Sequence, residues 1–233
     1  MIKKLLFAYQ NNKIKKQDPV MQHILDNNLS YLKAIDFQAL DKTIHRLNDQ
    51  KVSGIFMEAG CALGGSAIYI ADKKGPLRTF KIYDVFDMIP PPSGDDEDDV
   101  HKRYEIIKSG KSTGINNDTY YGYEKDLLQR VKNNFTEAGI DLDEKIEFIK
   151  GKFQETMEIS EPVAFAHIDC DWYESVMVCL NKIVPHLSIG GEIILDDYFV
   201  WSGCQKATDQ FLADSNLSFE KYGERKLHLV RKS

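Results

Sequence analysis

The sequence has 233 residues, of which 42% are hydrophobic and 28% charged, so it can bury one large α/β core or two small ones. Its net charge of −6 argues against a protein that holds nucleic acid or an anionic membrane by charge. The longest acidic run, GDDEDD at 94–99, is expected to be a solvated loop.

The chain ends and the cysteines indicate a cytoplasmic protein that spans no membrane. The apolar patch in MIKKLLFAYQNNKIKK is too short for a signal peptide and precedes no small-residue cleavage site. No later apolar run approaches the ~18 residues of a membrane span. The four cysteines are scattered without a CxxC pair, which favours a reduced protein without structural zinc.

Hydrophobic periodicity predicts helices first and then a sheet. Apolar residues recur at helical spacing from 21 to 48, which predicts one or two amphipathic helices in an N-terminal helical segment, residues 1–50. The strands expected after it are 54–60, 79–86, 145–151, 163–171, 191–198 and 226–233, and the helices are 64–74, 123–139, 173–187 and 204–215. Strand and helix in alternation are typical of a parallel sheet covered on both faces. We therefore expect one α/β domain over residues 1–233.

The segment from 88 to 119 lacks clear periodicity and contains both MIPPPSG and the acidic run. A loop of this length in a compact domain is usually functional or disordered. We expect it to be a lid over a binding site.

The first predicted strand runs into a glycine-rich turn, FMEAGCALGGSA. In open α/β sheets ligands bind beyond the carboxyl ends of the strands, and Gly60, Gly64 and Gly65 allow close approach to an anion held by helix amides. The pattern is GxxxGG after Glu58 rather than the dinucleotide GxGxxG. Amides for a carboxylate and Glu58 for an ammonium group point to S-adenosylmethionine. A turn that serves only strand–helix packing would leave the same pattern.

Asp84 ends the second predicted strand, at a distance from Gly60 close to the ~20 residues of nucleotide-binding βαβ units. Its carboxylate is placed to accept hydrogen bonds from ribose hydroxyls, although a plain helix cap or loop Asp would also fit. Gly151, in IKGKF after the third predicted strand, is placed where the backbone passes beside the adenine.

Two predicted strands end in paired acids. HIDCDWYES contains Asp169 and Asp171, and ILDDYF contains Asp196 and Asp197. On neighbouring parallel strands these carboxylates face one another, and they cannot all stay ionised without a cation. Oxygen ligands suit Mg²⁺, Mn²⁺ or Ca²⁺ rather than zinc. Any single Asp here is also a favoured helix N-cap, so the argument depends on two pairs at successive strand ends.

Such a site suits the ionisation of an alcohol. A bound cation lowers the pKa of a ligated oxygen, a neighbouring carboxylate takes the proton, and the alkoxide attacks the sulfonium methyl. Asp169 and Asp171 lie on the same side while the strand persists. We expect one of them to bind the ion and the other to act as base.

Six stretches resemble the macrocin O-methyltransferase-like family, the metal-dependent sugar O-methyltransferases of macrolide and aminocoumarin antibiotic pathways. They are MEAGCALGGSA, YDVFDMIPPP, FIKGKFQETM, HIDCDWYES, LSIGGEIILDDYFVWSGCQKATDQF and, more loosely, RVKNNFTEAGI, from about residue 54 to 213. The resemblance implies a class I S-adenosylmethionine-dependent methyltransferase fold, Rossmann-like and α/β, with a seven-stranded sheet whose last strand is antiparallel. It also implies N-terminal helices that help to form the site and a homo-oligomer, a dimer or larger.

The resemblance further implies roles for single residues. The implied metal ligands are Asp169, Asp196 and Asp197, with Asp171 as the general base. The implied cofactor contacts are Glu58, Gly60, Ser66 and Asp84.

Three positions depart from the pattern of the family. FDMIPPP replaces the usual FEGLP, Gln205 stands where a basic residue is common, and His167 stands where Arg is common. None of them is an implied metal ligand, so we expect the reaction class to hold, while the identity of the acceptor stays open.

We therefore expect an O-methyltransferase that uses S-adenosylmethionine and Mg²⁺ (or Mn²⁺) to methylate a hydroxyl of a sugar or polyhydroxylated small molecule in natural-product biosynthesis. Trp201, Tyr120, Tyr121 and Tyr123 are candidates for the acceptor pocket, although core packing explains them as well. The alternatives are a catechol or phenol O-methyltransferase, and a nucleotide- or sugar-binding module without turnover.

Overall fold

Seven strands form one sheet, in the order β3-β2-β1-β4-β5-β7-β6. The computed structural model describes residues 2–233, with side chains from residue 6 onward. The strands are β1 (Ile55–Ala59), β2 (Phe80–Asp84), β3 (Ile146–Lys150), β4 (Val163–Ile168), β5 (Leu187–Leu195), β6 (Phe219–Tyr222) and β7 (Leu227–Arg231). β7 runs antiparallel to both of its neighbours, and the pairs from β3 to β5 are parallel. The order reverses between β1 and β4, where open α/β sheets bind ligands.

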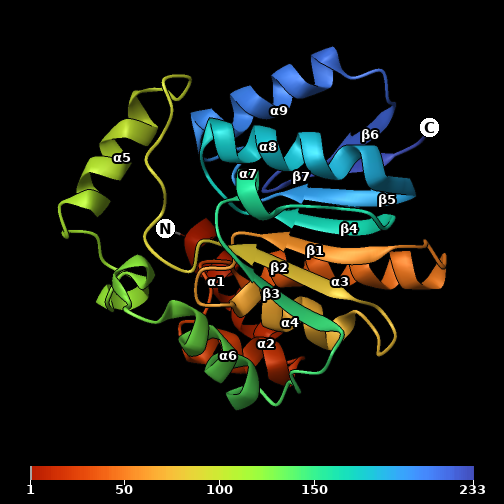
Figure 1. The fold of residues 1–233 in the computed structure, drawn as a ribbon. Helices are drawn as coiled ribbons and strands as arrows, with labels where there is room; N and C mark the ends of the chain where they lie inside the picture. The colour runs from red at the N-terminus through yellow and green to blue at the C-terminus, as the bar shows by residue number, and fades with distance from the viewer. Residues whose placement is uncertain (1) are drawn as a thin grey trace.

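Helices cover both faces of the sheet (Figure 1). On one face lie α2 (Pro19–Asp26), α3 (Ala34–Asp49), α4 (Gly65–Lys73) and α6 (Leu127–Glu137), and on the other lie α7 (Phe153–Thr156), α8 (Tyr173–Ile183) and α9 (Ser202–Asp214). The remaining helices are α1 (Ile2–Lys15), which packs on α2 and α3, α5 (Asp98–Lys108), and the short 3₁₀ turns η1 (Ile115–Asn117), η2 (Tyr121–Tyr123) and η3 (Val184–His186).

The central strands are buried on both sides, which explains their nearly continuous hydrophobic sequence. In β1, Phe56 packs into the hydrophobic cluster formed with α2, α3 and α4. Its neighbour Met57 points the other way, into the cluster formed with α8. Both side chains are almost completely buried, so the two-layer covering that the strand–helix alternation predicts is confirmed.

Most predicted elements are present, with small differences at their ends. The fourth strand was expected to reach residue 171 but ends at Ile168, and β5 begins at Leu187, four residues before its expected start. The residue pattern did not predict β6. It is a short edge strand with mainly exposed side chains, so burial left little periodic signal in its sequence.

The segment from 88 to 119 is partly helical, because it contains α5. Figure 1 shows α5 standing beside the sheet, away from both helical layers. Val100 and Ile107, seven residues apart, are buried in a small cluster with Ile89, Tyr120 and Trp172. Only these two residues of α5 are buried, and so short an apolar pattern did not indicate a helix.

The acidic run at 94–99 is not simply a solvated loop, contrary to our expectation. Asp96 is 7% exposed, and its carboxylate accepts hydrogen bonds from the amide of Ser93 (2.9 Å) and from the amide of Tyr173 at the start of α8 (2.7 Å). Asp98 and Asp99 lie in the first turn of α5, where negative charge is favourable for the helix dipole.

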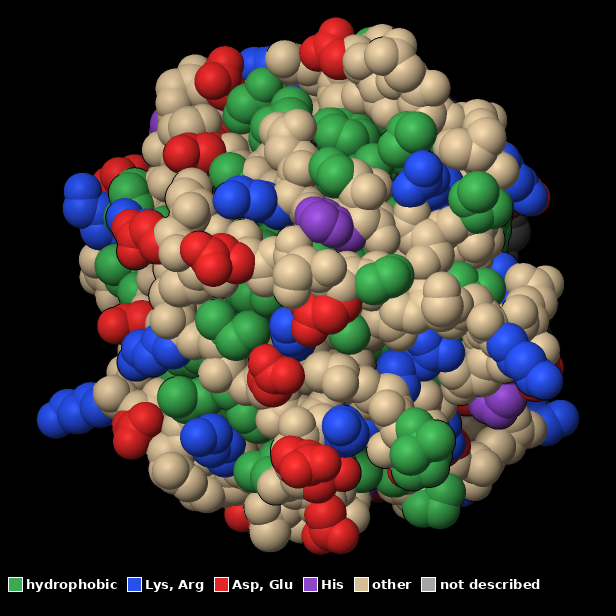
Figure 2. Space-filling view, turned by 45° about the vertical axis from the view of Figure 1, so that its right-hand side comes forward, with side chains coloured by type: hydrophobic (Ala, Val, Ile, Leu, Met, Phe, Trp, Pro, Cys, Tyr) green, Lys and Arg blue, Asp and Glu red, His purple; other side chains and the backbone are tan. Residues whose placement is uncertain are grey.

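Within the described part of the chain, no helix has the length and apolar character needed to cross a membrane. Figure 2 shows acidic and basic side chains interspersed over one face of the molecule. The four cysteines are free and buried.

Candidate active site

A cavity of about 620 Å³ opens at the carboxyl ends of β1, β2, β4 and β5. Gly60, Asp84 and Asp169, which follow or end three of these strands, line its floor, and Asp196 comes from the fourth. The segment that carries α5 supplies the opposite wall, including Arg103. The cavity therefore lies at the strand ends, where the sequence predicts a binding site.

The turn after β1 requires glycine at its first position. Gly60 has φ +84°, and a Cβ added there would lie 1.9 Å from the carbonyl oxygen of Asp169. The Asp84 carboxylate braces the same turn, because it accepts hydrogen bonds from the amides of Cys61 (2.7 Å), Ala62 (3.3 Å) and Phe86 (2.7 Å). Burial raises the pKa of Asp84, and these amide hydrogen bonds act against the rise.

Three of the predicted cofactor residues lie outside the cavity lining of the described chain. Glu58 is fully buried, and its Oε1 pairs with Nδ1 of His167 at 2.8 Å, while its Oε2 has no hydrogen-bond partner. Ser66 is buried in the first turn of α4. Gly151, at φ +145°, donates its amide to the backbone oxygen of Asp84 at 3.0 Å. Their contact with a cofactor stays a prediction.

Side chains from β4 and β5 meet as the sequence predicts. One ligand atom each from His167, Asp169 and Asp196 lies within 4.8 Å of the others. Burial, followed by the carboxylates of Asp196 and Asp197, raises the pKa of Asp169 well above its ordinary value. Repulsion between neighbouring carboxylates thus adds to the effect of burial.

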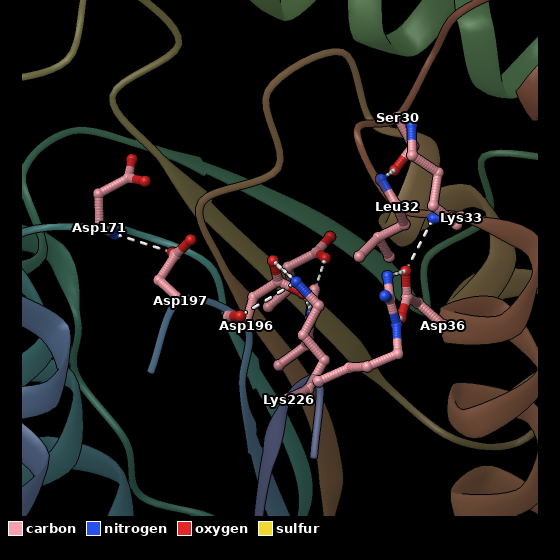
Figure 3. A network of polar contacts seen from close by, with 11 residues as sticks. Ser30, Leu32, Lys33, Asp36, Asp171, Asp196, Asp197 and Lys226 are labelled. Atoms are coloured by element: carbon pink, nitrogen blue, oxygen red, sulfur yellow. Dashed lines mark hydrogen bonds and ion pairs between the residues drawn. The ribbon is translucent and has the colours of Figure 1, made fainter. Parts of the chain in front are cut away.

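Asp197 has a different environment from the other two predicted ligands. Its Oδ2 accepts the amide of Asp171 at 3.1 Å, as Figure 3 shows. Burial and the carboxylate of Asp171 raise the pKa of Asp197 well above its ordinary value. In the described chain Asp197 is not part of the close group formed by Asp169 and Asp196.

The expectation that Asp169 and Asp171 lie on the same side of a strand does not hold, because β4 ends at Ile168. Asp171 has φ +57°, a left-handed conformation that redirects its side chain. It still lines the cavity. Burial, and then the carboxylates of Asp169 and Asp196, raise the pKa of Asp171 to about 7, while Arg103 acts in the opposite direction.

His167 is not one of the implied metal ligands, but it lies against two acids of the site. Its ring lies between Glu58, at 2.8 Å, and Asp196, at 3.5 Å. Burial alone would lower its pKa, but the nearby carboxylates of Asp196 and Glu58 outweigh it and raise the pKa of His167 to about 10. The His167 ring therefore links the β1 acid to the β5 acid.

The macrocin-O-methyltransferase (TylF) family matches residues 32–220. The chain belongs to this family. Among curated relatives, demethyldecarbamoylnovobiocin O-methyltransferase of Streptomyces niveus is 27% identical over 183 residues, which are 72% of this chain and 62% of that protein. Mycinamicin III 3''-O-methyltransferase of Micromonospora griseorubida is 28% identical over 183 residues, 72% of this chain and 64% of that protein. The chain thus spans less than two thirds of the length of these relatives.

Solved structures show the same fold. The O-methyltransferase NovP gives a TM-score of 0.73 at 22% identity, over 88% of this chain and 83% of its own. A methyltransferase of Podospora anserina, PaMTH1, solved with bound SAH, gives 0.60 at 14% identity, over 100% of this chain and 96% of its own. The predicted class I S-adenosylmethionine-dependent methyltransferase fold is confirmed.

Aromatic side chains form much of the remaining wall in this TylF-family chain. Tyr120, Tyr121 and Trp201, which the sequence singled out, line the cavity, as do Tyr31 and Trp172, which it did not. Trp172 and Trp201 pack edge to face at 5.9 Å between ring centroids. Tyr31 lies in the connection between α2 and α3, where no strand end or glycine pattern signals a site.

Three cationic residues that line the cavity were also missed, Arg103, Lys152 and Lys226. Arg103 lines the cavity, with its guanidinium 5.7 Å from the ring centroid of Tyr120. Lys226 lines it too and pairs with the carboxylate of Asp196. A lysine at the start of a predicted strand carries no sequence signal of its own, so only the fold brings it to the site.

Proposed function

We propose that the chain is an O-methyltransferase that moves the methyl group of S-adenosylmethionine to a hydroxyl of a sugar or polyhydroxylated small molecule in natural-product biosynthesis, with help from Mg²⁺ or Mn²⁺. One observation carries the proposal. Acids from two neighbouring strand ends, Asp169 and Asp196, meet in one group at a cavity that Asp171 also lines. Family membership and the activities named for the relatives support the reaction class.

The residues present fit a divalent cation. Asp196 Oδ1 is buried and receives no hydrogen bond in the described chain, although Nε2 of His167 lies 3.5 Å from it, and a buried oxygen in this state can accept a further partner. Asp169 beside it is a second oxygen donor, and hard cations prefer carboxylate oxygens. We infer that Asp169 and Asp196 would hold the ion, and that Asp197 would add the oxygen that the amide of Asp171 leaves free.

The metal supplies Lewis acidity, which makes a coordinated hydroxyl easier to ionise. Asp171 then accepts the hydroxyl proton at its carboxylate. A carboxylate that lines the cavity beside the proposed ion is placed to act as the general base. As the new oxygen–methyl bond forms, the bond between that methyl group and sulfur breaks, and the positive charge on sulfur disappears.

We assign the cofactor to the β1 and β2 side of the cavity. Gly60 lines the cavity in the turn after β1, and Asp84 lines it from the end of β2. Glu58, with one unpartnered buried oxygen, would receive the ammonium group after a small rearrangement. Ser66 and Gly151 would complete the contacts.

A phenolic or catechol acceptor is the second candidate. The six aromatic side chains that line the cavity, Phe153 included, favour it, because flat rings stack well on one another. The same rings also suit the CH face of a sugar, so the acceptor class has to be measured.

The test is methyl transfer from labelled S-adenosylmethionine, with Mg²⁺ or EDTA, to a panel of glycosides and catechols. Asp196→Asn should abolish transfer and the effect of Mg²⁺ while it leaves the affinity for S-adenosylhomocysteine nearly unchanged. Asp141→Asn, at an exposed position, is the matched control and should behave like wild type. Full turnover by Asp196→Asn would refute the proposed role of the metal.

A further inference from the structure

Lys226 connects Asp196 to the hairpin of β6 and β7, the last hairpin of the sheet. It is the residue just before β7, and its side chain is 15% exposed. Its ammonium group donates a hydrogen bond to Oδ2 of Asp196 and another, at 3.0 Å, to the backbone oxygen of Asp196. Figure 3 shows the side chain extended toward Asp196 from below. Lys226 thus holds both the carboxylate and the backbone of one residue.

The hairpin itself is fixed in place by α3. Arg225 makes two hydrogen bonds to Asp36, Nε to Oδ1 at 2.6 Å and a terminal nitrogen to Oδ2 at 2.9 Å. Asp36 is 5% exposed and also accepts the amide of Lys33 at 2.9 Å. Gly223 allows the turn before them, since at φ +102° an added Cβ would lie 2.1 Å from the backbone oxygen of Lys226. The backbone that carries the ammonium group of Lys226 is therefore held in a defined position.

The two oxygens of Asp196 have different surroundings. Oδ2 is occupied by Lys226. Oδ1 receives no hydrogen bond in the described chain, and Nε2 of His167 lies 3.5 Å from it. The group that Asp196 forms with His167 and Asp169 lies within 4.8 Å. The carboxylate is therefore held by one oxygen and keeps the other for a further partner.

We propose that Lys226 is a positioning residue: by holding Oδ2 and the backbone of Asp196, it turns Oδ1 of Asp196 toward the bound divalent cation. The inference rests on the proposed cation-dependent function. Partners behind a metal ligand commonly set its orientation, and their loss typically weakens metal binding ~10- to 100-fold.

Lys226 can act by orienting Asp196 or only through its positive charge, and these two roles predict opposite changes in cation affinity when Lys226 is replaced. If Lys226 acted only through its charge, its removal would make the site more negative and bind a cation more tightly. If Lys226 orients Asp196, its removal weakens binding, although a repulsive charge has gone. The sign of the change in cation affinity separates the two roles.

The experiment is calorimetric titration of Mn²⁺ into the metal-free full-length protein and its variants. Lys226→Met should weaken Mn²⁺ binding by ~10-fold or more, and Lys226→Arg, which keeps donors and charge, should restore most of it. Lys221→Met removes a positive charge from an exposed position on β6 of the same hairpin and should leave the affinity unchanged. Near-UV circular dichroism checks folding, and Lys226→Gln carries the same expectation if the Met variant does not fold.

Equal or tighter Mn²⁺ binding by the folded Lys226→Met variant would overturn the inference and leave the proposed function intact. A wild-type protein that binds no Mn²⁺ would refute the cation site itself, and the inference with it. The two failures are thus distinguishable in one set of titrations.

Discussion

At the scale of single residues, strained backbone gathers at the cavity. Ala62, Phe86 and Asp171 have φ values of +47°, +46° and +57°, and each follows the end of a parallel strand that borders the cavity. Such conformations cost of the order of 1–3 kcal/mol for each residue and persist where the surrounding structure enforces them. At Asp171 the enforcing contact is the carboxylate of Asp197, which holds its amide.

This geometry makes Asp171→Asn a clean test of the general base. Asn adopts the left-handed region about as readily as Asp, so the amide contact to Asp197 and the fold should survive. The variant cannot accept the hydroxyl proton, so kcat should fall by ~10²- to 10⁴-fold, with little change in affinity for Mn²⁺ or S-adenosylhomocysteine. A fall of less than ~10-fold, measured at saturating cofactor, would assign the base to another residue.

At the scale of elements, the central strands could be predicted because strands that are buried on both faces have nearly continuous hydrophobic sequences. β1 and β4 are buried at every position, and paired acids or glycines mark where they end. The edge strand β6 and helix α5 could not, since both are largely exposed and few apolar positions mark them. Predicting Lys226 and Tyr31 as site residues required the packing of distant segments, which local patterns do not contain.

Two aspartates attach the segment that is predicted to be a lid, residues 88–119, to the starts of α8 and α9. Asp96 joins the segment before α5 to the start of α8 through the amide of Tyr173. Asp99 adds a second link, because it accepts the amide of Ser202 at 3.2 Å at the start of α9. These contacts hold α5 beside the cavity, so if the segment is a lid, as the sequence predicts, their strength should set how often it opens.

Asp96→Ala should therefore loosen the lid without unfolding the protein. A hydrogen bond to a charged group contributes about 1.5–3 kcal/mol, so amides of 98–108 should exchange ~10-fold faster or more, and KM for the acceptor should rise. The measurement is hydrogen exchange followed by mass spectrometry. Asp98→Ala, whose side chain is 92% exposed, is the control, and equal exchange in both variants would contradict the anchoring role.

At the scale of the whole molecule, a buried acid ties the N-terminal helices to the last hairpin. Glu192 on β5 is fully buried. It accepts hydrogen bonds from Arg46 (2.7 Å) and Thr43 (3.0 Å) on α3 and from Tyr222 (2.7 Å) on β6, and it pairs with His228 (2.6 Å) on β7. Burial pushes the pKa of Glu192 upward, but these partners outweigh it and the pKa is lowered.

A lowered pKa means that the folded state favours the ionised carboxylate. Its contribution to stability is therefore complete above the ordinary pKa of 4.5 and is lost as the pH falls through the lower, folded value. Glu192→Gln should reduce the free energy of unfolding by about 2 kcal/mol at pH 7, and the difference from wild type should shrink below about pH 4.5. Urea denaturation in steps from pH 7 to pH 3 measures the difference in the free energy of unfolding between Glu192→Gln and wild type, with Glu220→Gln on exposed β6 as control. A difference that stays constant over this range would show that the negative charge of Glu192 contributes nothing and that only its shape matters.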